Sequence, residues 1–552
     1  MSNLHSYTPL TPTTLLERSG YVFRDREAIV LGDRTISYGD LLQRSRNLAR
    51  TLENMGIHEG SCVALLSDNG LHTFDAHFGI PATGGLIVSI NPWLSTDDIK
   101  YQLEFCKCSV VIASAAHFKR HEEIFQIHQS SIKYVLLVTE DDIDGYMVTD
   151  SITLLPYEKT IAENHSDEPL NAKISSEMSP IAVNFTSGTT GRPKGVTYSH
   201  RAAYLQALGQ VMMLGLNNSS RYFWSLPMFH GNGWFHIWAN VAAASRNILL
   251  SFRNDEDTDF PDLPTLTECL IKHRITHLGG APRLIRHIVT DTSPKWPGLT
   301  VMTGGAAPSP GLIRDMKYAG AHLIHQYGLN ETCGAFVVCE LQDNWVDMDE
   351  SRQIELRSRQ GAPALVAGTG LRVVDEHMKD VETDGKSLGE VIMAGNTVAL
   401  EYYNNPEATR KSFQDGWFRS GDIAVVHPDG YIEIKDRIKD MIYVDTNYGW
   451  LNISSLDVEK SISRCPGIKD VAVVGVNHDN NEKNGTKLVA FVEMIENSDL
   501  QIKDIEKFCE LNLGEYERPH YIVPTVLPKT ATGKIKKHEL ETRSVNLLSE
   551  AV

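Results

Sequence analysis

Short apolar runs alternate with longer stretches of helical periodicity along most of the chain. Residues 38–55 show the helical pattern, in which apolar side chains recur every three or four positions. A run that is apolar throughout suits a parallel strand that helices cover on both faces. The strand-like runs are residues 61–66, 110–113, 134–138, 180–185, 277–279 and 299–303. The alternation therefore predicts α/β layers around buried parallel strands.

The chain has 552 residues, which is too long for one compact core, because single cores stop growing at roughly 250 to 300 residues. The sequence pattern changes after Gly421, where a strand-like run at 431–435 ends in the charged segment 436–440. We expect a large, multi-layer α/β domain over residues 1–436 and a smaller α+β domain over residues 437–552. In the smaller domain we expect helices at 453–463 and 502–513, strands at 470–474 and 487–494, and a basic tail.

The charge balance argues against nucleic acid as a partner. The chain carries 70 acidic and 52 basic residues, and the resulting net charge of −18 would repel a phosphate backbone or an anionic lipid surface. Of the eight cysteines only Cys106 and Cys108 lie close together, at a spacing that does not suit a zinc site, so we expect reduced thiols. No basic segment followed by an apolar run begins the sequence, and no apolar run is long enough for a membrane span. These features predict a cytoplasmic protein without a transmembrane anchor.

The strand-like run at 180–185 leads directly into a segment suited to binding phosphate. Residues 186–195 contain four hydroxyl side chains, three glycines and Lys194. Glycines let successive N–H groups point at one anion, and the lysine adds a positive charge. The order differs from a Walker A loop, because Lys194 precedes Gly195 instead of following a glycine and preceding Ser or Thr. A solvent-exposed turn between a strand and a helix is the alternative interpretation.

Residues 186–200 resemble the signature loop of the adenylate-forming superfamily, which includes acyl-CoA synthetases, peptide-synthetase adenylation domains and luciferases. Five further segments resemble blocks of this family and stand in the family's order. They are Thr-Gly-Gly-Ala-Ala-Pro at 303–308, Gln-Tyr-Gly-Leu-Asn-Glu-Thr at 326–332, Trp-Phe-Arg-Ser-Gly-Asp at 417–422, Asp-Arg-Ile-Lys-Asp at 436–440 and Leu-Pro-Lys-Thr-Ala-Thr-Gly-Lys-Ile at 527–535. The resemblance implies that the C-terminal domain is mobile and turns about a hinge near Lys439.

The resemblance also implies an ATP site with Mg²⁺. Tyr327 would stack on adenine, Asp422 would accept hydrogen bonds from the ribose, and Glu331 and Thr186 would be the metal ligands. Asn330 stands where the family usually has Thr, so an amide would replace a hydroxyl contact to phosphate. The implied nucleotide-binding residues are Thr186, Ser187, Gly188, Thr189, Thr190, Gly191, Lys194, Gly304, Gly305, Ala306, Ala307, Gln326, Tyr327, Gly328, Asn330, Glu331, Thr332, Asp422, Ile434, Arg437 and Lys534.

The implied catalytic residues are Lys534, Glu331 and Lys194. A carboxylic acid is ionised at neutral pH, since its pKa is roughly 4, so its attack on the α-phosphate of ATP needs no general base. Nucleophile and phosphate are both anionic, and catalysis should therefore consist of positioning and charge screening. Without the resemblance, Lys534 would be one basic residue of a solvated tail.

The segment 226–234 resembles the entrance of the acid pocket in fatty and aryl acyl-CoA ligases, and the resemblance implies that His230, Asn232, Gly233, Trp234 and Gly305 bind the acid. Aromatic and apolar residues flank this segment and would suit an aliphatic or aromatic acid, or equally belong to the core. They are Tyr222, Phe223, Trp224, Phe235, Ile237 and Trp238.

Two departures from the family pattern stand out. Residues 441–451 replace a shorter Ser-Gly-Gly loop that lines the pantetheine tunnel in relatives, so the thiol acceptor is open to question. Glu401 stands where relatives commonly have Gly, and nothing in the sequence explains this change.

Three hypotheses follow from the sequence. The first is an ATP-dependent acyl-CoA ligase for a medium-chain, branched or aryl acid, with coenzyme A as the thiol. The second is an acyl-AMP ligase that loads the phosphopantetheine of a carrier protein. The third is a catalytically inactive nucleotide-binding protein, against which the presence of Lys194, Glu331 and Lys534 argues. A homodimer is compatible with each of them.

Overall fold

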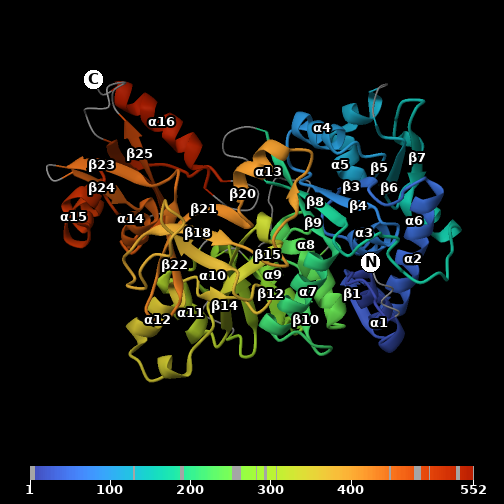
Figure 1. Cartoon of the computed structure of the whole chain (residues 1–552), viewed down its shortest axis with the longest axis horizontal. Helices are drawn as coiled ribbons and strands as arrows, with labels where there is room; N and C mark the ends of the chain where they lie inside the picture. Colours follow the sequence, from blue (N-terminus) through green and yellow to red (C-terminus); the bar gives the residue numbers. More distant parts are fainter. Residues whose placement is uncertain are drawn as a thin grey trace. The chain divides into compact units, whose positions relative to one another are not determined.

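The chain forms two compact units, and Figure 1 shows its helices and strands in the order of the sequence. The first unit comprises Met1–Asp347, Pro363–Gly370 and Met393–Phe418. The second comprises Met348–Ala362, Leu371–Ile392 and Arg419–Val552. The computed structural model describes residues 6–127, 131–186, 192–250, 263–280, 282–290, 295–305, 307–446, 449–477, 486–495, 498–529 and 535–550.

An eight-stranded sheet in the first unit carries the predicted phosphate-binding segment at one end. Its strand order is β19-β9-β8-β4-β3-β5-β6-β7, and β8 runs parallel to β4 but antiparallel to β9. The strands are β3 (Cys62–Leu66), β4 (Leu86–Ile90), β5 (Val110–Ser114), β6 (Tyr134–Val138), β7 (Thr153–Pro156), β8 (Pro180–Thr186), β9 (Lys194–Ser199) and β19 (Glu401–Tyr402). The strands predicted at 61–66, 110–113, 134–138 and 180–185 are thereby confirmed.

Helices cover both faces of this sheet, as Figure 1 shows for its blue strands. Val63 and Leu65 of β3 share one core with residues of α2 and α3, whereas Ala64 and Leu66 share the other with α4 and α5. The helices are α2 (Tyr38–Asn54), α3 (Leu71–Ala82), α4 (Thr96–Phe105) and α5 (Ala115–Arg120). Burial on both faces explains why these strands are continuous apolar runs.

A nine-stranded sheet in the order β16-β15-β14-β13-β12-β10-β11-β1-β2 forms the other main sheet of the first unit. The strands β1, β11, β10, β12, β13 and β14 are neighbours in that order and pair in parallel. Strand β2 is antiparallel to β1, and β15 is antiparallel to β14. They are β1 (Glu27–Leu31), β2 (Arg34–Ser37), β10 (Arg221–Phe223), β11 (Arg246–Leu249), β12 (His277–Gly279), β13 (Thr300–Thr303), β14 (His322–Leu329), β15 (Gly334–Val338) and β16 (Ala362–Pro363).

Helices also flank the second sheet. Helix α7 begins after β9, where the Ser199 side chain accepts a hydrogen bond from the Ala202 N–H, and it ends at Gly215 in the left-handed conformation (φ 65°). Besides α2 to α5, the described helices of the first unit are α1 (Thr13–Val22), α6 (Tyr157–Glu163), α7 (His200–Leu214), α8 (Gly231–Ala242), α9 (Leu263–Lys272), α10 (Pro282–Thr290), α11 (Pro310–Tyr318) and, within Met393–Phe418, α13 (Pro406–Ser412). The predicted class, a multi-layer α/β domain followed by a smaller α+β domain, is confirmed.

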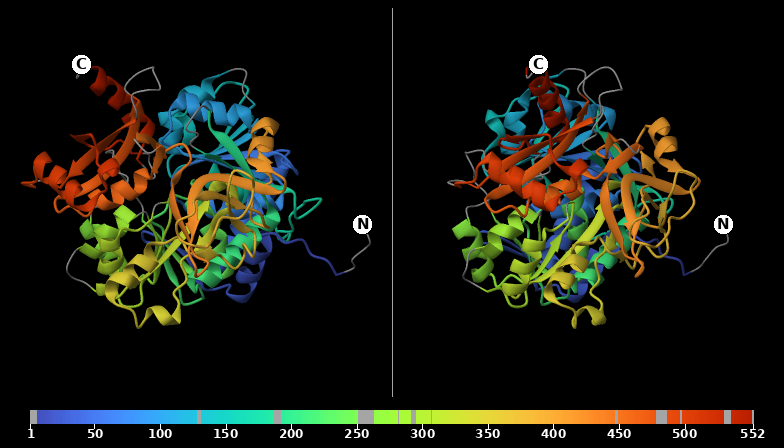
Figure 2. Two further views of the ribbon diagram at one scale, coloured as in Figure 1. Left: turned by 60° about the vertical axis from the view of Figure 1, so that its left-hand side comes forward. Right: turned by 90° about the vertical axis from the view of Figure 1, so that its left-hand side faces the viewer.

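The second unit contains a three-stranded sheet in the order β25-β26-β27, and Figure 2 shows its red strands between helices. Helices α14 and α15 pack on one face, while Leu540 of α16 packs on the other. The sequence predicted only a basic tail after 513, but α16 forms there because Leu540 and Ser544 are buried. The elements are α14 (Ser455–Ile462), β25 (Ile468–Asn477), β26 (Thr486–Met494), α15 (Ile502–Asn512), β27 (Tyr521–Pro524) and α16 (Lys537–Glu550).

In the segment 441–451, predicted as a long loop, most of the described residues belong to two paired strands. Strand β23 (Ile442–Thr446) pairs antiparallel with β24 (Gly449–Ile453), from Ile442 opposite Ile453 to Thr446 opposite Gly449. The β-branched residues Ile442, Val444 and Ile453 face the core, which accounts for the strand conformation. Other strands of this unit are β17 (Leu371–Val374), β18 (Gly389–Met393), β21 (Trp417–Val426) and β22 (Ile432–Arg437), and helix α12 (Glu350–Ser358) precedes them.

All eight cysteines are buried and free of disulfide bonds. Among the described residues, no helix combines the length and the apolar character that a membrane crossing needs. The domain boundary at 436/437 and the hinge at Lys439 stay predictions.

Candidate functional site

The predicted phosphate-binding segment connects the two strands of an antiparallel hairpin. Thr186, the last residue of β8, lies opposite Lys194, the first residue of β9, and Phe185 lies opposite Gly195. The elements that flank the segment are therefore two strands, not a strand and a helix. Its middle residues, Ser187, Gly188, Thr189, Thr190 and Gly191, lie outside the described part of the chain.

Tyr402 holds the base of this hairpin and connects two of the predicted catalytic side chains. It lies in β19, opposite Val196 of β9. Its ring centroid is 4.7 Å from the Lys194 Nζ, and its hydroxyl donates a 2.7 Å hydrogen bond to the Glu331 Oε1. None of the sequence motifs assigns a role to Tyr402. The structure thus brings Lys194 and Glu331, which are distant in sequence, to the ring face and the hydroxyl of one tyrosine side chain.

The environment of Tyr402 keeps its hydroxyl protonated. The side chain is only 4% exposed. Burial, and then the charge and hydrogen bond of Glu331, raise the pKa of Tyr402 above its usual value. A protonated phenol donates to the carboxylate, so Tyr402 fixes one oxygen of Glu331 and presents its ring face to the Lys194 ammonium.

The block that contains Tyr327 and Glu331 is a strand followed by one turn of 3₁₀ helix, η3 (Asn330–Thr332). Tyr327 and Gly328 lie just before the last residue of β14, where a Cβ on Gly328 would lie 2.0 Å from the Gly334 carbonyl oxygen. Only glycine permits this close approach of β14 and β15. The Thr332 hydroxyl is buried and donates to the Gly334 carbonyl (2.7 Å), so it stabilises the turn that presents Glu331.

The turn after β13 supplies the predicted adenine-binding residues. Gly304 and Gly305 follow Thr303 directly, and Gly305 is exposed with φ 81°, a conformation that favours glycine. Ala307 is exposed as well, and Ala306 falls in a gap of the described structure. Gln326 differs from the others, because its buried amide donates to the Gln210 Oε1 at 3.1 Å and so serves the packing of β14 on α7.

Two asparagine side chains hold the segment that resembles the acid-pocket entrance. The Asn69 amide donates to the Leu226 carbonyl (2.8 Å) and accepts from the Met228 N–H (2.7 Å). The Asn184 amide, from β8, donates to the Phe229 carbonyl at 3.2 Å. The segment is therefore attached both to the β3–α3 connection and to the strand that precedes the phosphate-binding residues.

Four of the five predicted acid-binding residues lie at 230–234, at or just before the start of α8, whereas Gly305 follows β13. The His230 carbonyl accepts a hydrogen bond from the Gly233 N–H (2.8 Å). The side chains of Asn232 and Trp234 are outside the described structure. The six flanking residues are at most 3% exposed, which favours core packing for these side chains: Tyr222, Phe223, Trp224, Phe235, Ile237 and Trp238.

The second unit contains the remaining described residues of the predicted nucleotide site. Asp422 of β21 lies opposite Arg437 of β22, and the Arg437 Nε is 3.3 Å from the Asp422 Oδ1. The Ile434 N–H donates to the Gln360 side chain at 2.7 Å. The Lys439 side chain is 44% exposed and lies 3.6 Å from Asp440. Lys534 is outside the described residues, so its predicted catalytic position stays a prediction.

Comparison with known proteins identifies the family. The model of the AMP-binding enzyme family matches residues 16–403, and that of the AMP-binding enzyme C-terminal domain matches residues 457–534. A 4-hydroxybutyrate–CoA ligase of Metallosphaera sedula is 35% identical, over 98% of this chain and 95% of that protein. An acetate–CoA ligase of Humulus lupulus is 36% identical, over 98% of this chain and 96% of that protein.

Solved structures share the fold. The crystal structure of an anthranilate CoA ligase in complex with anthranoyl-AMP superposes with a TM-score of 0.83, covers 100% of both chains and is 24% identical. The fold and the matched sequence define an adenylate-forming enzyme. The chain belongs to the AMP-binding enzyme family, and it is an AMP-forming acid–thiol ligase.

Proposed function

We propose that the protein joins a carboxylic acid to AMP with release of pyrophosphate and then transfers the acyl group to coenzyme A. The observation that carries the proposal is the Lys194–Tyr402–Glu331 arrangement at the base of the phosphate-binding hairpin. It places a cation over the ring and a carboxylate at the hydroxyl of one rigid side chain, an arrangement that suits a magnesium-bound polyphosphate.

Glu331 and Thr186 would hold Mg²⁺ together with phosphate oxygens and water. The donor set fits, because Mg²⁺ takes oxygen ligands and is usually bound through one or two carboxylates plus the phosphates of its nucleotide. Within the described part of the chain, no group of three or more potential ligands forms a resident metal site. The ion would supply charge screening at the β- and γ-phosphates.

The chain's own residues would then control the charge of the first reaction. Lys194 would bind the departing pyrophosphate, and Tyr402 would keep Glu331 in place with a fixed hydrogen bond. Lys534 would contact the α-phosphate and the attacking carboxylate. Asp422 and Arg437 would orient the ribose, and Tyr327 would stack on adenine.

Coenzyme A is the proposed thiol because the two relatives described above are both named as CoA ligases. The β23–β24 hairpin favours the second candidate, transfer to the phosphopantetheine of a carrier protein, since it replaces the Ser-Gly-Gly loop that the resemblance leads us to expect. The acid is proposed to be a medium-chain, branched or aryl carboxylate. Its pocket would lie beside the segment that Asn69 and Asn184 hold.

The test is a panel of carboxylic acids scored by pyrophosphate release, with coenzyme A and a phosphopantetheinylated carrier protein assayed in parallel. We expect acid-dependent release that coenzyme A accelerates, with acyl-CoA as the product. Pyrophosphate release that yields acylated carrier protein but no acyl-CoA would identify the carrier protein, and not coenzyme A, as the thiol acceptor. No release with any acid would contradict the proposal.

A further inference from the structure

Lys537, the first residue of α16, extends into a buried polar cluster within the second unit. Its Nζ lies 2.8 Å from the Glu459 Oε1 and donates a 2.5 Å hydrogen bond to the Ser455 Oγ. The side chains of Lys537 and Glu459 are only 15% and 13% exposed. Lys537 therefore ties the start of α16 to two positions of α14.

Asp436 continues this cluster into strand β22. The Ser455 N–H and hydroxyl both donate to the Asp436 Oδ2, at 2.6 and 2.7 Å. The other oxygen, Oδ1, accepts from the Arg437 N–H at 2.8 Å. Asp436 is 1% exposed, so Lys537, Ser455 and Asp436 form one buried chain of charge-assisted hydrogen bonds.

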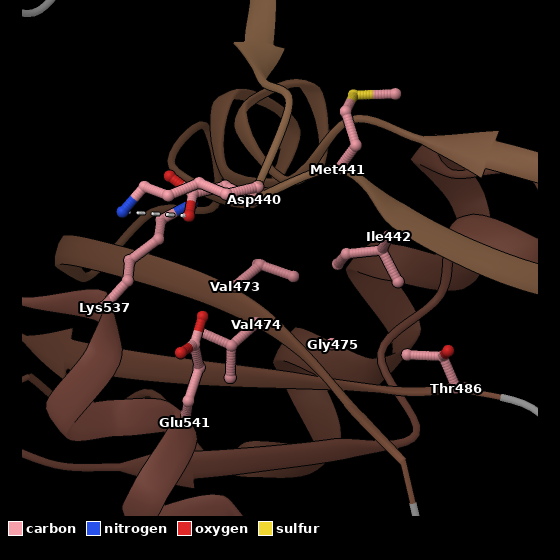
Figure 3. Close-up of a pocket in the computed structure, with 10 residues that line it drawn as sticks. Asp440, Met441, Ile442, Val473, Val474, Gly475, Thr486, Lys537 and Glu541 are labelled. Atoms are coloured by element: carbon pink, nitrogen blue, oxygen red, sulfur yellow. Dashed lines mark ion pairs between the residues drawn. The ribbon is translucent and has the colours of Figure 1, made fainter. Parts of the chain in front are cut away.

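The charges in the cluster depend on Lys537. Burial disfavours its ammonium, but Glu459 and Asp436, with Asp440 as a further contributor, raise the pKa of Lys537 above its usual value. Figure 3 shows the Lys537 side chain extending toward Asp440 at the edge of a cavity of about 170 Å³. Without the lysine, buried carboxylates would remain beside one another without a cation from α16.

Weaker ion pairs cross from β22 to α14 near this cluster. The Lys435 Nζ lies 3.6 Å from Asp457, and the Lys460 Nζ lies 3.8 Å from Glu433. Partly exposed pairs at such distances contribute little individually. The buried cluster is therefore the stronger link between β22 and the helices.

The cluster joins residues on opposite sides of the predicted pivot. Asp436 precedes Lys439 in the chain, whereas Ser455, Glu459 and Lys537 follow it. A rotation of the backbone at Lys439 would move Asp436 relative to Ser455, so these hydrogen bonds can form in only one of two orientations.

We propose that Lys537 is a positioning residue for adenylation, which it favours by stabilising one orientation about Lys439. This inference rests on the proposed function. Asp436 adjoins Arg437, which pairs with Asp422, and Lys537 stands three positions after Lys534 in the sequence. The cluster thus links β22, beside the predicted ribose-binding residue Arg437, to the start of α16, and it would favour the orientation in which Lys534 approaches the nucleotide.

The test compares Lys537→Met with Lys537→Arg and with Lys536→Met as a matched control. Lys536 is adjacent and 38% exposed, and it pairs with Glu539 of α16 at 2.9 Å. Two rates are measured: acid-dependent exchange of pyrophosphate into ATP, and thioester formation from supplied acyl-AMP and coenzyme A. We expect Lys537→Met to slow the first by about tenfold or more and to leave the second within about twofold. Lys537→Arg should keep most of the wild-type rate of pyrophosphate exchange, and Lys536→Met should change neither rate.

An equal fall of both rates in Lys537→Met, together with a lower Tm, would show a merely structural role and overturn the proposal. An unchanged rate of pyrophosphate exchange in Lys537→Met would also overturn it. Amide hydrogen exchange of the same variants separates this failure from that of the proposed function. We expect faster exchange at Ser455 and at residues 437–441 in Lys537→Met but not in Lys536→Met. If the wild-type protein shows no acid-dependent reaction, the proposed function fails. Unchanged protection in Lys537→Met would instead overturn the role of the cluster.

Discussion

Replacing Tyr402 by Phe removes one hydrogen bond and leaves the aromatic ring in place. The lost bond is the 2.7 Å contact from the hydroxyl to the Glu331 Oε1, while the ring beneath the Lys194 Nζ stays. A hydrogen bond to a charged group contributes about 1.5–3 kcal/mol, and a cation–π contact about 0.5–2 kcal/mol. The substitution therefore separates the positioning of the carboxylate from the contact with the lysine.

We expect kcat/KM for adenylation to fall by about tenfold to about a hundredfold in Tyr402→Phe, because each 1.4 kcal/mol lost from the transition state corresponds to about a factor of ten. The apparent KM for Mg²⁺ should rise, since Glu331 would no longer be held in one orientation. Pyrophosphate release measured over a range of Mg²⁺ concentrations gives both quantities.

Tyr403→Phe is the matched control. Its hydroxyl lies 3.6 Å from the Cys62 Sγ, and its backbone N–H, which the substitution keeps, donates to the Gly195 carbonyl. We expect a nearly unchanged rate in this variant. The reasoning is refuted if Tyr402→Phe keeps the wild-type kcat/KM and Mg²⁺ dependence, or if both variants lose activity equally.

Three further predictions concern catalysis and stability. Lys534→Ala should abolish most adenylation while ATP still binds, and an unchanged pyrophosphate-release rate would exclude its proposed role. Arg44→Met should destabilise the protein by about 3–5 kcal/mol, because it leaves the fully buried Asp75 carboxylate without its 2.8 Å partner; thermal unfolding with an unchanged Tm would contradict this. Burial lowers the pKa of His77 and His200 to about 4, so the unfolded chain binds more protons below pH 6.5. Each neutral histidine therefore contributes to the free energy of unfolding above pH 6.5. This contribution falls by about 1.4 kcal/mol per pH unit as the pH falls from 6.5 toward 4. The Tm of His200→Gln should therefore fall less steeply with decreasing pH than the Tm of the wild-type protein. An equally steep fall of Tm would argue against this role of His200.

The sequence predicted the layered fold because its signals are local. A strand buried on both faces is a continuous apolar run, and five residues such as Tyr134–Val138 suffice to recognise it. The helix at Tyr38–Asn54 was equally clear from its periodicity and ended within one residue of the predicted position.

The contacts of the site could not be predicted in the same way. The link between Lys194 and Glu331 passes through Tyr402, and it depends on β19 joining the edge of β9 far along the chain. Glu401, which departs from the family pattern, is exposed on that edge strand.

The hairpin of β23 and β24 and the helix α16 were missed for a related reason. Residues 441–451 stand where the family pattern has a shorter loop, but their β-branched residues favour strands. In α16, Leu540 is buried against β25 and β26, and a tail of basic residues gives little indication of such packing. Tertiary burial decided both conformations.

The most direct test of the account is exchange of labelled pyrophosphate into ATP in the absence of any thiol. We expect exchange that requires both Mg²⁺ and a carboxylic acid, because the reversal of acyl-AMP formation regenerates ATP. Exchange that proceeds equally without acid, or none with any acid while ATP binds, would contradict it.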